Sequence, residues 1–396
     1  MYTRKGLVRM NRRSLALSLL AVGTTLCCGC GDSAQPGEPV SVGQTSAVGD
    51  LSELPAGPIS EVSNLRVTAG SSYVALYGGF QLGKTGTPEA FNDKVAILSL
   101  SDNKWNSITL PEQIANPTAI LSGGALYIAG PRCTSAPPAD DSEPYCESAP
   151  IDVESYDIQS GTWRDLSDGL NLSEDAVGSP THAEAVGSTE GSVVFGFGAS
   201  ALEYHSLDPR AAAWQDLPAP PADTSSMCAV NDSLYSVGVP DVVPIEGGSA
   251  PKDVRVYSLV PDNSRWEPVT THAAVDVGQL SNRIECGAGE LAIVPMQARS
   301  ASESRGILWR SDVGNLEEVP AIPLTFPGAT VAELGGSRLL FAADPVGGAY
   351  ALTGKSWTNT GLDIAVVEAY QVDQGLVLST QGGFSSGPGL YLLSPH

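Results

Sequence analysis

The chain has 396 residues, and its 44 acidic against 21 basic side chains give a formal net charge of −23. Hydrophobic residues make up 42% of the sequence, which is enough for a sizeable core and excludes general disorder. The excess of negative charge would repel a phosphate backbone, so nucleic acid is not expected as a partner.

Residues 1–29 have the pattern of a cleaved signal peptide. Basic residues, among them Arg12 and Arg13, precede a short apolar run at residues 15–22. This run is too short to span a bilayer, whereas a secretory signal has this length and this charge pattern. The sequence therefore predicts an exported protein, either retained in the cell envelope or secreted.

The end of this segment carries three cysteines close together. Residues 26–33 read Leu-Cys-Cys-Gly-Cys-Gly-Asp-Ser and resemble the end of a bacterial lipoprotein signal, where a small residue precedes the lipidated cysteine. The resemblance implies lipidation of Cys30, and Cys27 or Cys28 are alternatives because Cys27 stands where the pattern has leucine. A plain secretory signal is the other interpretation. Residues 30–49 are rich in small and polar residues and predict a flexible tether.

Tryptophan recurs about every fifty residues through the rest of the chain. Each tryptophan is paired with an apolar or aromatic residue seven positions away, and turn-like residues lie between the two. This pattern predicts an outer β-hairpin with the bulky pair packed across it as structural core. The six pairs are Leu98/Trp105, Tyr156/Trp163, Leu207/Trp214, Leu259/Trp266, Trp309/Leu316 and Tyr350/Trp357.

Two further short strands precede each hairpin. The second of them often ends in glycine, as at residues 74–79 and 125–130. Four short strands per fifty residues are typical of the blade of a β-propeller. Seven such units occur, which predicts an all-β fold of seven blades over residues 50–396.

The two ends of the chain are expected to close the ring together. The last unit stops at residues 391–396, before its fourth strand. Residues 51–55, Leu-Ser-Glu-Leu-Pro, match the outer strands at 214–218 and 316–320. We therefore expect the N-terminal strand to complete the seventh blade beside residues 391–393, because this pairing removes the open edge of an unclosed ring.

Two motifs carry a resemblance to a known family. Tyr77-Gly78-Gly79, and Tyr156-Asp157 followed by Gly161-Thr162-Trp163, resemble kelch repeats of the galactose-oxidase/kelch propeller superfamily. The resemblance extends over residues 50–396. It implies a β-propeller and assigns no catalytic residue.

The ring contains four cysteines, an even number that predicts disulfides in an oxidising compartment. Cys133 and Cys146 bracket an acidic insert and are expected to pair across it. Cys228 and Cys286 occupy nearly the same place in consecutive units, so we expect them to join blade four to blade five. A zinc site is the alternative for four cysteines, but they lack the paired C-x-x-C spacing.

The connections between second and third strands leave a propeller on one face. The long ones are predicted at residues 80–93, 131–150, 240–252 and 297–306. Long polar loops on one face of a rigid ring are a usual place for recognition, and neutral variation in loop length is the alternative.

No set of catalytic, metal-binding or cofactor-binding residues is recognisable. The four histidines, at 182, 205, 272 and 396, fall on unlike parts of different units. Clustered acids at 140–147 and 174–175 lack the spacing of a calcium loop and predict a solvated acidic surface.

The sequence therefore favours a non-catalytic, monomeric binding protein without a cofactor. It would be envelope-anchored or secreted and would recognise a protein or a glycan through the long loops, with membrane contact only through a lipidated N-terminus. The alternative is a carbohydrate-active propeller enzyme, such as an oxidase, lyase or epimerase, because propellers can assemble sites from residues far apart in sequence.

Overall fold

The chain divides into two compact units, Met1–Ser41 and Val42–His396, and the structure is described for the second. In this computed structural model the described residues are 44–59, 62–82, 88–132, 150–173, 182–189, 191–198, 202–221, 224–230, 232–238, 252–260, 262–275, 282–287, 290–295, 305–310, 315–321, 329–342, 347–354, 356–380 and 388–396. The predicted signal peptide with Cys27, Cys28 and Cys30 lies outside this set, and so do Cys133 and Cys146.

Across these ranges the secondary structure is entirely β, and no helix suited to crossing a membrane is found there. Seven antiparallel sheets form seven blades, numbered here in chain order. The innermost strands are β4 (Arg66–Gly70), β10 (Thr118–Ser122), β14 (His182–Thr189), β18 (Thr224–Val230), β22 (Asn282–Gly287), β26 (Ala329–Leu334) and β30 (Glu368–Val372). The second strands are β5 (Tyr73–Tyr77), β11 (Ala125–Pro131), β15 (Ser192–Gly198), β19 (Ser233–Gly238), β23 (Glu290–Pro295), β27 (Ser337–Ala342) and β31 (Gly375–Ser379).

The outer half of each blade is a hairpin in the first six units. The third strands are β8 (Lys94–Ser99), β12 (Ile151–Asp157), β16 (Glu203–Asp208), β20 (Lys252–Leu259), β24 (Arg305–Arg310), β28 (Ala349–Thr353) and β32 (Leu390–Ser394). The outermost strands are β9 (Lys104–Thr109), β13 (Thr162–Asp165), β17 (Ala213–Asp216), β21 (Trp266–Val275), β25 (Asn315–Ala321), β29 (Ser356–Asn359) and, in blade 7, β2 (Asp50–Glu53).

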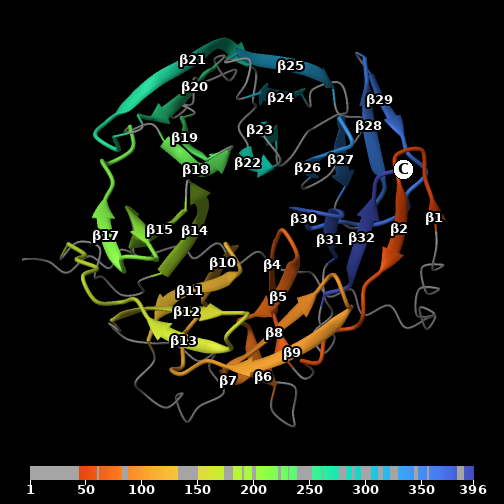
Figure 1. Cartoon of the computed structure of the whole chain (residues 1–396). Helices are drawn as coiled ribbons and strands as arrows, with labels where there is room; N and C mark the ends of the chain where they lie inside the picture. The colour runs from red at the N-terminus through yellow and green to blue at the C-terminus, as the bar shows by residue number, and fades with distance from the viewer. Residues whose placement is uncertain are drawn as a thin grey trace, which may run out of the picture. The chain divides into compact units, whose positions relative to one another are not determined.

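The blades form a closed ring. Each innermost strand contacts the innermost strand of the next blade, and β30 of blade 7 contacts β4 of blade 1 (Figure 1). The core therefore lies between neighbouring sheets, where apolar side chains from adjacent blades interdigitate. Between blades 2 and 3, for example, Phe195 and Phe197 pack with Tyr127 and Val153.

The predicted closure by the N-terminal strand is confirmed. Strand β2 pairs with β32, with Leu51 opposite Leu393 and Glu53 opposite Tyr391. Leu51 is buried in a cluster that combines residues of blades 6 and 7. The first and last strands of the ring thus share one sheet, and the edge that an open ring would expose is paired.

The sheet of blade 7 extends one strand further than expected. Strand β1 (Gln44–Thr45) pairs with β2 as a fifth strand, and a turn at Ser46–Gly49 joins them. The sequence placed this stretch in a flexible tether. The strand forms because Ser46 Oγ closes the turn by donating to Gly49 O at 2.9 Å, which returns the chain along β2.

The segment 80–93, expected to be an irregular loop, contains two strands of a second small sheet. Strands β6 (Phe80–Leu82) and β7 (Pro88–Phe91) pair with each other, and β6 also pairs with β3 (Val62–Ser63). Phe80 and Phe91 pack together with ring centroids 5.3 Å apart. This small sheet brings the chain back to blade 1 on the same face from which it left.

Gly79, the second glycine of the Gly-Gly pair, is required immediately before strand β6. Its φ is +80°, and a Cβ there would lie 2.2 Å from Ser63 O. We expect Gly79→Ala to lower the free energy of unfolding by about 2–4 kcal/mol, since the left-handed backbone strain and the clash add.

Gly123 provides the control for this substitution. Its φ is +58°, and nothing lies within 4 Å of a Cβ built there. Gly123→Ala should therefore cost only about 1–2 kcal/mol in chemical denaturation. Equal losses in the two variants would show that the close approach to Ser63 has no energetic weight.

Five of the six predicted outer pairs are opposite one another in the hairpins, as in Leu98↔Trp105 and Trp309↔Leu316. The sixth is wrong, because Leu352, not Tyr350, lies opposite Trp357. Here Thr353 pairs with Ser356 across a two-residue turn, which moves the register by two positions.

The tryptophans whose side chains are described lie at the outer edge of the core and are half-buried. Three indole groups also donate a hydrogen bond to the preceding blade. Trp105 Nε1 donates to Pro55 O at 3.0 Å, Trp214 Nε1 to Leu166 O at 2.7 Å, and Trp266 Nε1 to Pro218 O at 2.9 Å. The repeated tryptophan therefore packs within its own blade and links that blade to its neighbour.

Candidate functional site

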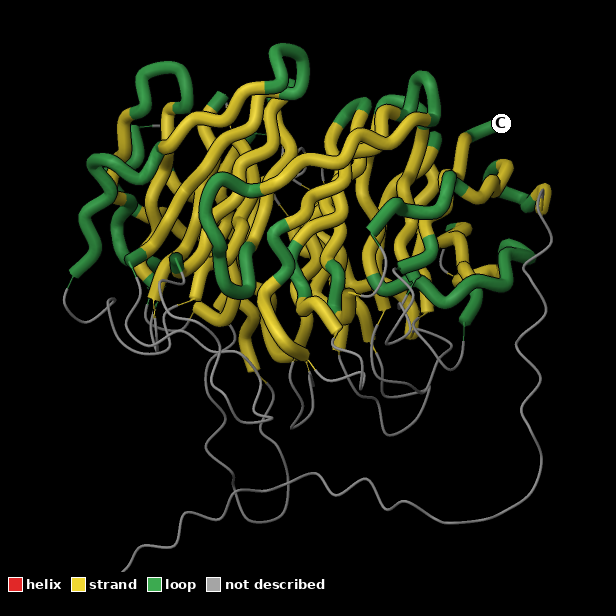
Figure 2. Tube along the Cα trace, turned by 90° about the horizontal axis from the view of Figure 1, so that it is seen from below, coloured by secondary structure: helices red, strands yellow, loops and turns green. Residues whose placement is uncertain are grey.

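One face of the ring receives the starts of the innermost strands and the ends of the second strands. In blade 1, Arg66 at the start of β4 is opposite Tyr77 at the end of β5, and in blade 7 Glu368 is opposite Ser379. Because the second strands end here, the connections to the third strands begin on this face. We refer to it as the loop face; the strands run between it and the opposite face (Figure 2).

A cavity of about 660 Å³ lies inside the ring. It is lined by innermost strands of blades 1, 2, 3, 4 and 7, and many of the lining residues are small, such as Ala69, Ala119, Ala185 and Ala369. Its volume is within the range of small-molecule sites. The small side chains therefore leave room for a ligand or for water.

Four polar side chains gather where this cavity meets the loop face: Arg66, Tyr77, Glu368 and Tyr370, which we call the channel mouth. All four line the cavity. Arg66 is exposed, and its Nη1 donates to Pro117 O at 3.0 Å. The hydroxyl oxygen of Tyr370 lies 2.6 Å from Glu368 Oε2 and 2.7 Å from Val67 O, so the single phenolic proton is aimed at two acceptors.

Tyr77 is 5% exposed and packs in the core between blades 1 and 2, and this burial keeps its phenol protonated. Burial raises the pKa of Tyr77 to about 12; Arg66 opposes this shift and Glu368 adds to it. A phenol with this pKa stays a hydrogen-bond donor at neutral pH. The channel mouth thus combines a cation, a carboxylate and hydroxyl groups, a set that can donate to and accept from a polar ligand.

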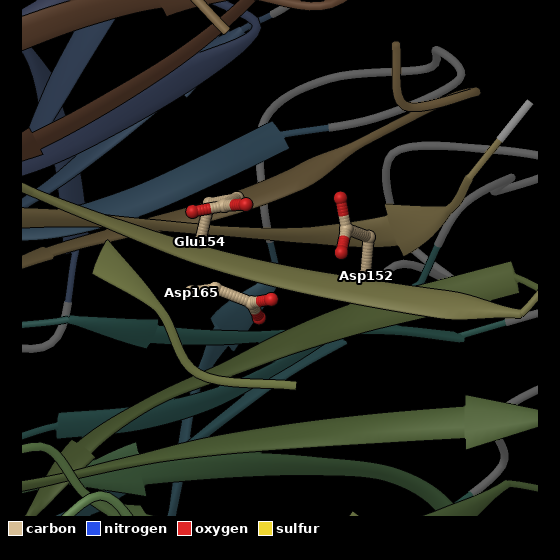
Figure 3. Close-up of side chains that lie close together, drawn as sticks. All are labelled: Asp152, Glu154 and Asp165. Atoms are coloured by element: carbon tan, nitrogen blue, oxygen red, sulfur yellow. The ribbon is translucent and has the colours of Figure 1, made fainter. Parts of the chain in front are cut away.

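A second group of titratable side chains lies in the outer half of blade 2. Asp152 and Glu154 project from β12, and Asp165 from β13 stands opposite Glu154. We call these three residues the carboxylate cluster (Figure 3). One carboxylate oxygen from each residue lies within 4.8 Å of the others, so these are the described residues that could hold a metal ion.

The cluster faces the seam between blades 1 and 2. Side chains alternate along a strand, so Asp152 and Glu154 are on the same side of β12 as Tyr156, which packs on blade 1. Asp152 is fully buried and forms an ion pair with Arg132 at 2.6 Å. Ser167 Oγ donates to the same Asp152 oxygen, Oδ1, at 3.0 Å.

The pKa values of Glu154 and Asp165 are shifted in opposite directions. Burial raises the pKa of Glu154 to about 7; the charges of Asp152 and Asp165 add to this shift, and Arg132 opposes it. Hydrogen bonds from Ser167 lower the pKa of Asp165. The cluster therefore contains three carboxyl groups beside one guanidinium group, that of Arg132.

The equivalent positions of blade 3 carry a different set. The outer pairs Tyr156↔Trp163 and Leu207↔Trp214 align the two hairpins, so Glu203, His205 and Asp216 correspond to Asp152, Glu154 and Asp165. His205 is buried, and its Nδ1 lies 3.0 Å from Asp216 Oδ1. Glu203 accepts hydrogen bonds from the backbone N–H and the hydroxyl of Ser173.

The structure places the second predicted cysteine pair in comparable positions. Cys228 is on β18, opposite Tyr235, and Cys286 is on β22, opposite Leu291. These innermost strands are neighbours in the ring. Cys228 is buried, and its disulfide with Cys286 stays a prediction.

Sequence reasoning did not single out the channel mouth or the carboxylate cluster. The acids that it considered, at 140–147 and 174–175, lie outside the described residues. Repeat alignment was the available signal. It places Arg66 and Glu368 at the same position of blades 1 and 7, and Glu154 at the position of His205.

No model of a known protein family matches the chain, and no curated protein matches its sequence. Among solved structures, polysaccharide lyase Uly1 is 10% identical with a TM-score of 0.51, covering 86% of this chain and 91% of that one. The β-propeller domain of the Trilobed protease from Pyrococcus furiosus is 9% identical (TM-score 0.47, 84% and 93% covered). A chain of the Mitotic Checkpoint Complex is 13% identical (TM-score 0.49, 97% and 100% covered).

The seven sheets and their cyclic contacts define the chain as a seven-bladed β-propeller. The likeness to the lyase agrees with this fold and extends no further, because sequence identity is low. The kelch resemblance stays a prediction.

Proposed function

We propose that this propeller is an exported, non-catalytic binding protein that recognises a glycan at the channel mouth on its loop face. The observation that carries the proposal is the cavity of about 660 Å³ with Arg66, Tyr77, Glu368 and Tyr370 at its opening. Binding sites of this size commonly place a few polar groups around a preformed hollow. A protein ligand held by the loops is the other form of this proposal.

Binding is favoured over catalysis by the state of Tyr77. A general base works best when its pKa is near the working pH, and burial moves the pKa of Tyr77 away from that range, to about 12. Tyr77 is thus suited to donate a hydrogen bond. The resemblance to a polysaccharide lyase leaves an enzyme as the alternative, since a fold does not determine function.

A neutral glycan fits the charges better than an acidic polymer. The net charge of −23 disfavours polyanions, while Arg66 and Glu368 roughly balance each other at the channel mouth. Sugar hydroxyl groups both donate and accept, which matches a guanidinium beside a carboxylate and phenols.

Export and anchoring belong to the same proposal. The basic and apolar pattern of residues 1–29 supports export, and Cys30 is the residue that we propose to be lipidated. The same proposal includes the bridges Cys133–Cys146 and Cys228–Cys286, because an oxidising compartment allows disulfides to form.

The test is a binding screen of the purified full-length chain on immobilised neutral oligosaccharides, followed by titration calorimetry with the sugar that binds. Arg66→Ala and Glu368→Gln should each weaken binding about tenfold or more, because each removes a hydrogen bond to a charged group. Lys94→Ala is the control, since Lys94 is an exposed cation of blade 1 that does not line the cavity.

Three results would contradict the proposal. Binding that is equal in the wild type and in both channel-mouth variants would place the ligand elsewhere. Shortened or oxidised sugar in mass spectra of the incubated mixture would show an enzyme. Capture of a specific envelope protein, with no sugar bound, would favour the protein ligand.

A further inference from the structure

The carboxylate cluster of blade 2 has more negative charge than its surroundings compensate. Arg132 is the one cation that contacts it among the described residues, and its ion pair is with Asp152. Glu154 and Asp165 face each other across the two outer strands, and Glu112 adds a further negative charge nearby. Two acids opposite one another in a sheet repel each other unless something positive lies between them.

A buried oxygen in the cluster lacks a hydrogen-bond partner. Asp152 is 0% exposed, and its Oδ1 is used by both Arg132 and Ser167. Its second oxygen, Oδ2, has no partner within the described part of the chain. Buried carboxylate oxygens are normally satisfied, so this one indicates a group that belongs beside it.

Blade 3 carries a histidine at the position of Glu154, and its Nε2 is buried without a partner among the described residues. His205 stands opposite Asp216 where Glu154 stands opposite Asp165, and the imidazole Nδ1 is 3.0 Å from the Asp216 carboxylate. One repeat therefore places a hydrogen-bonding imidazole opposite its aspartate. The other repeat supplies a third acid.

We propose that the carboxylate cluster binds a hard divalent cation, Ca²⁺, through Asp152, Glu154 and Asp165. Calcium takes oxygen ligands at about 2.3–2.6 Å, so two ligands on one ion are at most about 5 Å apart. The carboxylate oxygens satisfy this limit, lying within 4.8 Å of one another. An all-oxygen set suits calcium or magnesium and not zinc, which prefers nitrogen and sulfur.

Arg132 does not compete for this site. It occupies Asp152 Oδ1, which leaves Oδ2 for the ion. Ser167 fixes the carboxylates of both Asp152 and Asp165, so two of the three ligands are oriented in advance. Because Asp152 is the second residue of β12, the ion would tie the start of this strand to β13 and to the seam with blade 1.

Calcium titration of the chelator-treated, purified full-length chain tests the proposal. Calorimetry should show one more bound Ca²⁺ per chain in the wild type than in Glu154→Gln or Asp165→Asn. At a hundredfold excess over the dissociation constant, Ca²⁺ should raise the melting temperature of the wild type by about 4 °C. Asp152 is left intact in both variants because its removal would leave Arg132, whose side chain is 33% exposed, without its ion-pair partner.

Two further variants separate the ion site from general stability. Glu203→Gln changes the corresponding acid of blade 3 and should leave the extra Ca²⁺ bound. Glu154→His installs the blade 3 arrangement, so it should fold, lose the extra Ca²⁺ and melt in chelator at or above the temperature of the wild type.

Several results would overturn the assignment. If the acids merely share a proton, Ca²⁺ and chelator would change neither heat nor melting temperature in the wild type. An unchanged Ca²⁺ response in Glu154→Gln would place the ion elsewhere, and a larger shift with Mg²⁺ than with Ca²⁺ would contradict calcium as the ion.

Discussion

Replacing Leu51 with aspartate is expected to destabilise all seven blades together, lowering the free energy of unfolding by about 3–5 kcal/mol. Leu51 is 4% exposed and packs with residues of blades 6 and 7, among them Phe341 and Leu393. A carboxylate at this position would be buried without a partner. It would also detach β2, on which closure of the ring depends.

Ser52 is the matched control, since it is the exposed neighbour on the same strand. Ser52→Asp should change stability by less than about 0.5 kcal/mol. Urea denaturation followed by tryptophan fluorescence measures both variants, because tryptophans occur in six of the repeats. A Leu51→Asp protein as stable as the wild type would show that the ring does not need its N-terminal strand.

Truncating Trp214 to alanine is the second large effect, with an expected loss of about 3 kcal/mol. Its ring packs edge-on against Phe197 at a centroid distance of 6.1 Å, and its Nε1 donates to Leu166 O of the preceding blade. The value is at the lower end for a tryptophan because the side chain is half-buried. Packing and the bond between blades are both removed.

Trp214→Phe separates these two contributions. It keeps most of the aromatic packing and removes only the hydrogen bond to Leu166, so we expect a loss of about 1 kcal/mol. Chemical denaturation of both variants gives the comparison. If phenylalanine is as costly as alanine, the hydrogen bond between blades outweighs the packing; if neither variant is destabilised, the repeated tryptophan is not structural.

The closed ring was predictable because its signals are local. Outer strands share a short pattern, so residues 51–55 were recognisable as the missing strand of blade 7, and β2 pairs with β32. The hairpin of blade 6 was misread because Tyr350 and Leu352 are both plausible partners by residue type. Which of the two lies opposite Trp357 depends on the turn of the hairpin, which is two residues shorter than in the other units.

The strands at residues 80–82 and 88–91 depend on pairing that the sequence does not display. Strands β6 and β7 are short, and they are strands because β3 lies alongside to complete their hydrogen bonds. A sequence of this kind is equally compatible with a loop until a third strand is in place.

The sequence by itself determined the number of blades, their strand order and five of the six outer pairs, since strand alternation and repeat spacing are properties of a few neighbouring residues. Only the tertiary structure decided which polar groups meet. Arg66 and Glu368 lie 302 positions apart and share one cavity because the ring closes. The acids of blade 2 differ from those of a solvated surface because strand register brings them together and the neighbouring blade buries them. Register between strands and burial between blades exist only in the assembled ring.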